Sequence, residues 1–119
     1  MAITGIDHVQ VAAPPGCEAA ARAFYGVLLG LEELPKPAPL AARGGCWFRA
    51  GSAELHVGVE EPFVPARKAH PGFTVADLDE LAARLRAAGI EVARDDSIPG
   101  TNRFHTADPF GNRLEFRQA

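Results

Sequence analysis

The sequence contains four histidines, and three of them stand in segments where apolar and polar residues alternate. His8, His56 and His70 occupy polar positions of such segments, and Glu115 does so close to the end of the sequence. Imidazole and carboxylate groups together suit borderline divalent ions. Two histidines and one carboxylate with open positions form non-haem iron sites, and a third histidine favours a five- or six-coordinate centre. If the fold brings these side chains together, the chemistry they indicate is binding of Ni, Co, Zn, Mn or Fe, the identity of the metal remaining open.

A structural role is the alternative for each of these residues taken singly. A lone histidine on a strand is commonly a hydrogen-bonded structural group. Glu115 lies between Arg113 and Arg117, so it could belong to a solvated face of ion pairs worth about 0–1 kcal/mol. The shared position of the candidates within their segments is what favours the metal site.

The elements that must position these residues include four segments with the period of a half-buried strand. They are residues 7–12, 54–59, 70–75 and 112–117. One side of each predicted strand is apolar and should pack on a dry core, while the other side is polar and should face water. The apolar set is Val9, Val11, Leu55, Val57, Val59, Phe73, Val75, Leu114 and Phe116.

Two helices are predicted to cover the apolar sides. The clearer one spans residues 77–89, where Asp77 and Glu80 have the spacing of a capping box and Gly89 suits a left-handed end. The other spans residues 17–30 and ends at Gly30, with a weaker start signal. The expected buried stripes are Ala20, Phe24 and Leu28 in the first helix, and Leu78, Leu81, Leu85 and Ala88 in the second. Each helix is followed by two further β-like stretches, at residues 31–35 and 46–50, and at 90–94 and 103–107.

The spacing of these elements indicates that the chain repeats one unit. Positions 8 and 56 are 48 residues apart, and positions 70 and 115 are 45 apart. From the glycine that ends each helix, His56 and Glu115 are both 26 residues away. Two tandem βαβββ modules of an α+β fold explain this agreement, with His8 equivalent to His70 and His56 to Glu115. The expected division is module 1 at about 1–60, a Pro-containing linker at about 60–68 and module 2 at about 69–119.

Length and composition restrict the class of protein. A chain of 119 residues with 47% hydrophobic and 23% charged residues is typical of one globular domain. A net charge of −3 disfavours nucleic acid as a partner, and no apolar run approaches the roughly 20 residues that span a bilayer. We therefore expect no membrane partner and a cytoplasmic location. Cys17 and Cys46 are expected to be reduced, buried thiols.

Five stretches carry a likeness to a known family. They are IDHVQV, AFYGVLLGL, AHPGFTVADLDEL, AAGIEV and DPFGNRLEF, which together span nearly the whole chain, the last being the most specific. The chain resembles the vicinal oxygen chelate superfamily of glyoxalases, bleomycin-resistance proteins and dioxygenases. The resemblance implies two βαβββ modules whose mixed sheets curl into a cup, and a homodimer. Carried over by position, the family's metal ligands fall on His8, His70 and Glu115, with His56 as the fourth.

The resemblance implies two classes of function. One is a divalent-metal-dependent lyase, isomerase or dioxygenase that chelates vicinal oxygens of a small substrate. The other is a metal-free binding or sequestration protein of the bleomycin-resistance type, which typically loses ligand positions. Glyoxalase I usually has Glu where this chain has His56, whereas the His, His, Glu triad of extradiol dioxygenases agrees with the ligands here.

The same resemblance suggests roles around the metal. His56 would serve as ligand or general base, and Glu54 is the reserve candidate for the base, with a solvated carboxylate as its alternative. Arg103 and His105 are expected to contact substrate, His105 because it stands where some members place a substrate-contacting tyrosine. Phe48 and Gln10 are further candidates for the pocket wall, although aromatic residues in strands more often belong to the core.

Overall fold

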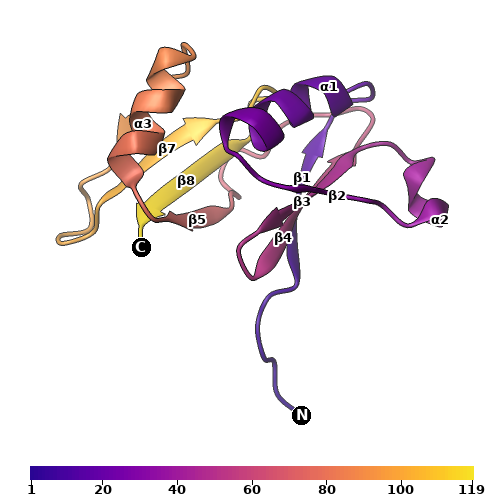
Figure 1. Cartoon of the computed structure of the whole chain (residues 1–119), viewed down its shortest axis with the longest axis horizontal. Coiled ribbons are helices and arrows are strands. Elements are labelled where there is room, and N and C mark those ends of the chain that lie inside the picture. The colour runs from indigo at the N-terminus through magenta and orange to yellow at the C-terminus, as the bar shows by residue number, and fades with distance from the viewer. The chain divides into compact units, whose positions relative to one another are not determined.

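The strands of this α+β protein form one four-stranded mixed sheet in each half of the chain (Figure 1). The computed structural model describes all residues, 1–119, as two units, Met1–Val64 and Pro65–Ala119. Unit 1 contains β1 (His8–Ala13), β2 (Glu33–Leu34), β3 (Cys46–Ala50) and β4 (Ala53–Val59) in the order β1-β4-β3-β2. Unit 2 contains β5 (Gly72–Val75), β6 (Ala93–Arg94), β7 (Arg103–Ala107) and β8 (Arg113–Gln118) in the order β5-β8-β7-β6. The identical strand order confirms the two tandem modules.

The strand register establishes which positions are equivalent in the two units. In the parallel pairs, Gln10 lies opposite His56 in unit 1 and Gly72 lies opposite Glu115 in unit 2. In the antiparallel pairs, Trp47 lies opposite His56, and His105 lies opposite Glu115. His56 and Glu115 therefore occupy equivalent places, as the spacing predicts, and so do Trp47 and His105.

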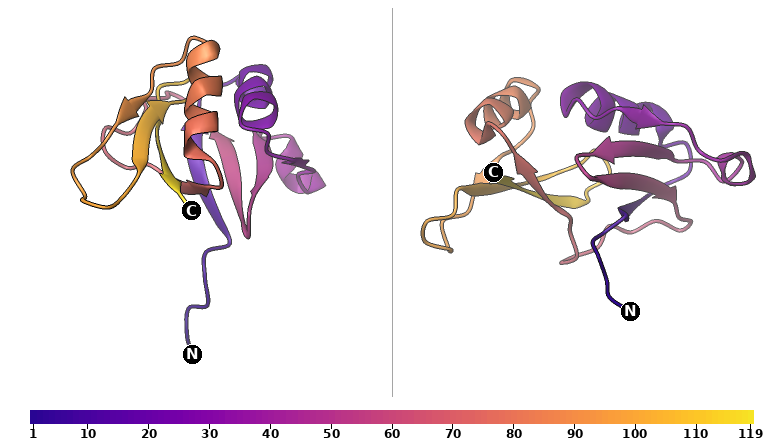
Figure 2. Two further views of the ribbon diagram at one scale, coloured as in Figure 1. Left: turned by 60° about the vertical axis from the view of Figure 1, so that its left-hand side comes forward. Right: turned by 60° about the horizontal axis from the view of Figure 1, so that its bottom comes forward.

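Helix α3 (Leu78–Ala87) forms as its end signals predict, and it packs beside the sheet of unit 2 (Figure 2). The Asp77 side chain accepts a hydrogen bond from the Glu80 backbone N–H at 3.0 Å, and Gly89 ends the helix with φ +77°. The buried residues are Leu78, Ala82 and Leu85. Leu81 is half-buried and Ala88, which caps the C-terminal end of the helix, is exposed, so the buried stripe is shorter than predicted.

The first helix is wound differently from the prediction. It consists of α1 (Glu18–Ala21) followed by a π-helical segment, η1 (Arg22–Leu28), in which Leu29 N–H donates to the Phe24 carbonyl at 2.9 Å. Ala21, Phe24 and Tyr25 are buried in the core. Ala20 is exposed and Leu28 only half-buried, so of the predicted stripe only Phe24 is fully inside.

One short helix was not predicted. Helix α2 (Ala38–Ala41) lies within residues 35–45, which the sequence suggests are a loop. Pro37 caps it and a proline occupies its first turn, where the fixed φ of proline suits a helix start. Both α1 and α2 belong to unit 1 (Figure 1).

The apolar sides of the strands form the core of each unit. Phe48 and Leu55 are fully buried in unit 1, where Phe48 packs 5.7 Å from the Tyr25 ring, and Leu114 and Phe116 are buried in unit 2. One apolar position differs from the expectation, since Val9 on the outermost strand β1 is 37% exposed.

Two residues on the polar sides of the strands are less exposed to solvent than the alternation of apolar and polar residues predicts. His56 is 5% exposed and Glu115 is 8% exposed, although both stand at polar positions. Neighbouring side chains cover them, as described below. No helix is long and apolar enough to cross a membrane.

Candidate metal and ligand site

Unit 2 brings three good metal ligands together. One ligand atom each from His70, His105 and Glu115 lies within 4.8 Å of the others. His70 stands two residues before β5, while His105 in β7 is the direct cross-strand neighbour of Glu115 in β8. Because cross-strand neighbours project from the same face of a sheet, this pairing fixes the cluster.

The His70 ring is held between two oxygen acceptors. Its Nδ1 lies 2.8 Å from the Lys68 carbonyl oxygen, and its Nε2 lies 3.0 Å from Glu115 Oε1. Each ring nitrogen therefore faces an oxygen acceptor. A cation bound to both His70 Nε2 and Glu115 Oε1 would lie where these two atoms now meet.

Each carboxylate oxygen of Glu115 has a hydrogen-bond partner. Oε1 accepts from His70, and Oε2 accepts from Arg103 Nη1 at 3.2 Å, with Arg117 Nε further away at 3.8 Å. The His70 hydrogen bond and, after it, Arg103 hold the pKa of Glu115 below its usual value against the opposing effect of burial. The carboxylate is therefore the anionic centre of the cluster.

His105 is oriented by an acid that the sequence did not single out. Its Nε2 lies 2.9 Å from Asp95 Oδ2, which also pairs with Arg103 at 3.0 Å. Hydrogen bonds from Ser97, followed by the one to His105, hold the pKa of Asp95 well below its usual range. The other imidazole nitrogen, Nδ1, is buried and has no hydrogen-bond partner in the chain. That nitrogen is free to act as a ligand when it is unprotonated.

Unit 1 holds its two histidines in a stack. The rings of His8 and His56 are 4.3 Å apart at 12°, and the indole of Trp47 lies 4.0 Å from His56 at 3°. His56 Nε2 is 2.9 Å from Glu54 Oε1, and His8 Nδ1 is 2.9 Å from Asp7 Oδ2. Stacking and hydrogen bonding together fix the ring of His56 and exclude water from it.

The predicted four-ligand set divides between the units, two residues in each. His70 and Glu115 are in contact in unit 2, and His8 and His56 are in contact in unit 1. The set of four stays a prediction. His105, which the sequence placed among substrate contacts, joins the ligand cluster, and the pairing of the last two strands was the signal that could have shown it. Asp95 gave no signal of its own, because it follows a two-residue strand.

The structure also locates the predicted substrate contacts. Arg103 lies within the cluster and Gln10 is exposed on β1. Phe48 is a correction: it is fully buried and points into the core with Tyr25, because it shares the apolar face with its cross-strand partner Leu55. Its neighbour Trp47 carries the aromatic ring on the polar face.

Cys17 and Cys46 are buried free thiols, and burial is the main reason that the pKa of Cys17 is raised to about 11.

Comparison with known proteins shows which family and fold the chain is similar to. The chain is 56% identical to a glyoxalase family protein from Bacillus anthracis, with a TM-score of 0.96 and 99% and 97% of the two chains covered. Lactoylglutathione lyase from Agrobacterium tumefaciens is 23% identical, with a TM-score of 0.76 and 98% and 95% covered. The antibiotic-binding protein TnmS3 from Streptomyces sp. CB03234 is 22% identical, with a TM-score of 0.76 and 99% and 98% covered. The last two likenesses concern the fold alone.

A comparison with curated protein sequences gives no match. A family model, by contrast, matches residues 5–116, which include all the histidines and Glu115. The modules, their strand order and this match agree, and the chain belongs to the Glyoxalase/Bleomycin resistance protein/Dioxygenase superfamily.

Proposed function

We propose that the protein is a divalent-metal-dependent enzyme that acts on a small molecule with two adjacent oxygens, by glyoxalase-like lyase or isomerase chemistry or by dioxygenase-type chemistry. The observation that carries the proposal is the cluster of His70, His105 and Glu115, whose ligand atoms lie within 4.8 Å of one another. Imidazole and carboxylate donors in this number suit Ni, Co, Zn, Mn or Fe. We propose His8 and His56 as further ligands, as the family resemblance implies.

The outer contacts of the two unit 2 histidines support binding of a metal. Histidine ligands usually donate their other ring N–H to a carbonyl or carboxylate. His70 Nδ1 is hydrogen-bonded to the Lys68 carbonyl, and His105 Nε2 is hydrogen-bonded to Asp95. His70 Nε2 and His105 Nδ1 are therefore the ring nitrogens that would bind the metal. An ion bound between His70 Nε2 and Glu115 Oε1 would replace their hydrogen bond and engage both ligand atoms at the same time.

The chain's own residues would divide the remaining work. A bound divalent ion supplies Lewis-acid polarisation of the substrate oxygens. Arg103 keeps Glu115 and Asp95 in position and presents positive charge to an anionic substrate group. His56, oriented by Glu54, is the proposed proton acceptor, and Glu54 itself is the reserve candidate.

Metal content tests the proposal directly. Protein purified without a metal-chelating tag should contain stoichiometric divalent metal by elemental analysis, and Glu115→Gln should lose it. A wild-type chain that takes up none of Ni, Co, Zn, Mn or Fe would refute the proposal.

The neighbouring arginines provide a matched pair of variants. Arg103 contacts Glu115 at 3.2 Å and is mostly buried, whereas Arg117 lies 3.8 Å away and is 45% exposed. Arg103→Met should weaken metal binding by about 10- to 100-fold, the usual effect of removing a residue that holds a ligand. Arg117→Met should change it less than about threefold, and equal losses in both variants would show a general charge effect instead.

A metal-free binding protein is the second candidate. It is favoured by the fact that all four histidines already lie beside carboxylates: Asp7, Glu54, Glu115 and Asp95. Such pairs satisfy the rings without an ion. In this case His70→Ala would leave ligand affinity unchanged and elemental analysis would find no bound metal.

A further inference from the structure

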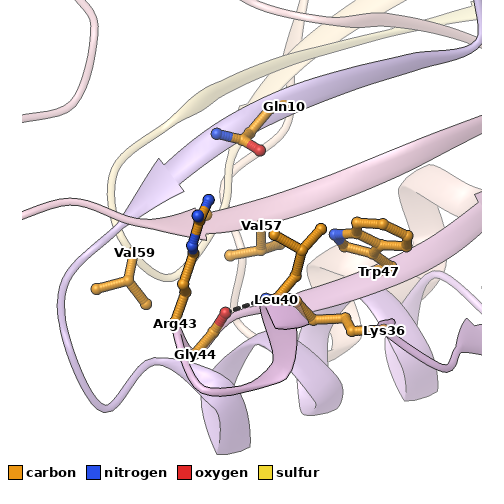
Figure 3. A pocket seen from close by; sticks show the side chains of 9 residues that line it. Gln10, Lys36, Leu40, Arg43, Gly44, Trp47, Val57 and Val59 are labelled. Carbon is orange, nitrogen blue, oxygen red and sulfur yellow. Dashed lines mark hydrogen bonds between the residues drawn. The ribbon is translucent and has the colours of Figure 1, made fainter. Parts of the chain in front are cut away.

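Unit 1 contains a pocket that does not include the unit 2 cluster (Figure 3). Its volume is about 240 Å³, below the roughly 300–1,000 Å³ of sites for drug-sized ligands. A water molecule takes up roughly 30 Å³ in the liquid, so this volume has room for about eight water molecules. It also has room for a ligand of one ring and one small head group. The lining consists of Gln10, Lys36, Leu40, Arg43, Gly44, Trp47, Val57, Gly58 and Val59.

The charged groups that line the pocket are both positive. Lys36 and Arg43 contribute the cations, and no aspartate or glutamate lines the pocket. Neither cation belongs to any of the chain's ion pairs; Lys36 donates a hydrogen bond to the Gly44 carbonyl and has further N–H groups to offer. The nearby Glu18 carboxylate does not line the pocket, and its Oε2 accepts from Gly45 N–H at 2.7 Å and from the Cys17 thiol. The two cations of the pocket therefore have no carboxylate partner within hydrogen-bonding distance.

The rest of the wall consists of apolar side chains, two glycines and the Gln10 amide. In Figure 3, Arg43 extends towards Gln10, and Leu40 and Trp47 lie next to each other. The parallel stack on His56, at 3°, prevents the indole of Trp47 from turning. Gly58 leaves room for the Gln10 amide, because a Cβ there would lie 2.7 Å from Gln10 Nε2. A rigid aromatic wall with an amide and two cations fits a planar ligand that carries one negative group.

We propose that this pocket binds a small aromatic carboxylate, with the ring against Trp47 and Leu40 and the carboxylate on Arg43 and Lys36. Arginine binds carboxylates through two parallel hydrogen bonds, and aromatic rings pack favourably on an indole. The site requires no metal and uses residues of unit 1 alone, so it goes beyond the proposed metal chemistry and does not depend on it.

Three ligands of nearly equal size separate the contributions of charge and ring. Benzoate has both features, benzamide keeps the ring without the charge, and cyclohexanecarboxylate keeps the charge without the planar ring. Trp47 is the only tryptophan in the chain, so its fluorescence reports on this wall, and calorimetry gives an independent affinity. Benzoate should bind saturably to the full chain and shift the Trp47 emission, with benzamide at least about tenfold weaker and cyclohexanecarboxylate weaker than benzoate.

Variants should locate the binding. Arg43→Met and Lys36→Met should each weaken benzoate binding by at least about tenfold, as loss of a charged hydrogen bond does. Arg84→Met, an exposed cation on α3 in the other unit, is the matched control and should bind like the wild type. Trp47→Leu, measured by calorimetry, should also bind more weakly. Thermal unfolding of each variant checks that it is folded.

Glu115→Gln separates this proposal from the metal site. If benzoate bound a metal in unit 2, affinity would fall in Glu115→Gln and in chelator-treated wild type, and the pocket would be refuted. Equal weakening in Arg84→Met and Arg43→Met would refute it as well, as would the lack of saturable benzoate binding. Binding that survives in Glu115→Gln and is lost in Arg43→Met supports it whether or not the protein binds a metal.

Discussion

At the scale of single residues, Glu115 shows most clearly how position and surroundings act together. The alternation of residues 112–117 predicts that its side chain leaves the core side of the strand. It does not predict that His70 and Arg103 would then bury it, because those contacts join segments far apart in the chain. The result is a carboxylate that is 8% exposed and hydrogen-bonded to both His70 and Arg103.

A pH dependence of stability follows from these neighbours. Folding lowers the pKa of Glu115 below its ordinary 4.5, so its charge stabilises the folded state above about pH 4.5. This stabilisation is lost as the pH falls through the lowered folded pKa. The free energy of unfolding of the wild type should exceed that of Glu115→Gln by about 1–3 kcal/mol at pH 7. Urea titrations at pH 7 and at steps below pH 4.5 should show the difference shrinking.

The control for this titration is Glu91→Gln, which changes an exposed glutamate outside the cluster. Its difference from the wild type should be near zero at every pH. A gap for Glu115→Gln that stayed constant, or widened, towards low pH would contradict the assignment of charge to Glu115 in the folded state.

At the scale of elements, helix α3 and the first helix show what local sequence can and cannot decide. The ends of α3 depend on neighbours three or four residues away, Asp77 with Glu80 and the left-handed Gly89, so the sequence is sufficient to predict them. The π-helical winding of η1 has no such local signal. The sequence predicts a helix there and the burial of Phe24, but Tyr25 and Ala21 enter the core where Ala20 and Leu28 are expected.

The cap of α3 can be measured. Asp77→Ala removes the acceptor for Glu80 N–H and should lower the free energy of unfolding by about 0.5–2 kcal/mol. Asp77→Asn keeps a side-chain oxygen and should restore most of the loss. Asp96→Ala, at an exposed loop position, is the control and should have almost no effect in the same urea titration. An equal loss in the alanine and asparagine variants would show that the cap does not act through this hydrogen bond.

At the scale of the whole molecule, the repeated module could be predicted because spacing, strand alternation and helix ends agree in both halves. The family likeness of the last nine-residue motif, DPFGNRLEF, pointed to the same fold. The candidate site could be predicted only in part, through His70 and Glu115. Asp95 and the ligand position of His105 depend on pairings between β6, β7 and β8, which no local pattern specifies.

A homodimer is the expected assembly. Val9 on β1 is 37% exposed and Ile6 just before it is 68% exposed, so apolar surface lies along an edge strand, where proteins usually cover it. Light scattering at micromolar concentration should give twice the 12.6 kDa mass of the chain. Val9→Lys should shift the protein towards monomer, whereas Val27→Lys, at an exposed position on η1, should not. A monomeric wild type would refute the dimer.

The matching register of the two units is typical of a structural repeat of one βαβββ segment. Trp47 and His105 lie at the same place in their modules, so the two halves differ in chemistry at an equivalent position. One copy now has an indole flat against an imidazole, and the other has a second imidazole beside a carboxylate. One architecture used twice thus carries two different sets of side chains, for which we propose ring recognition in unit 1 and ion binding in unit 2.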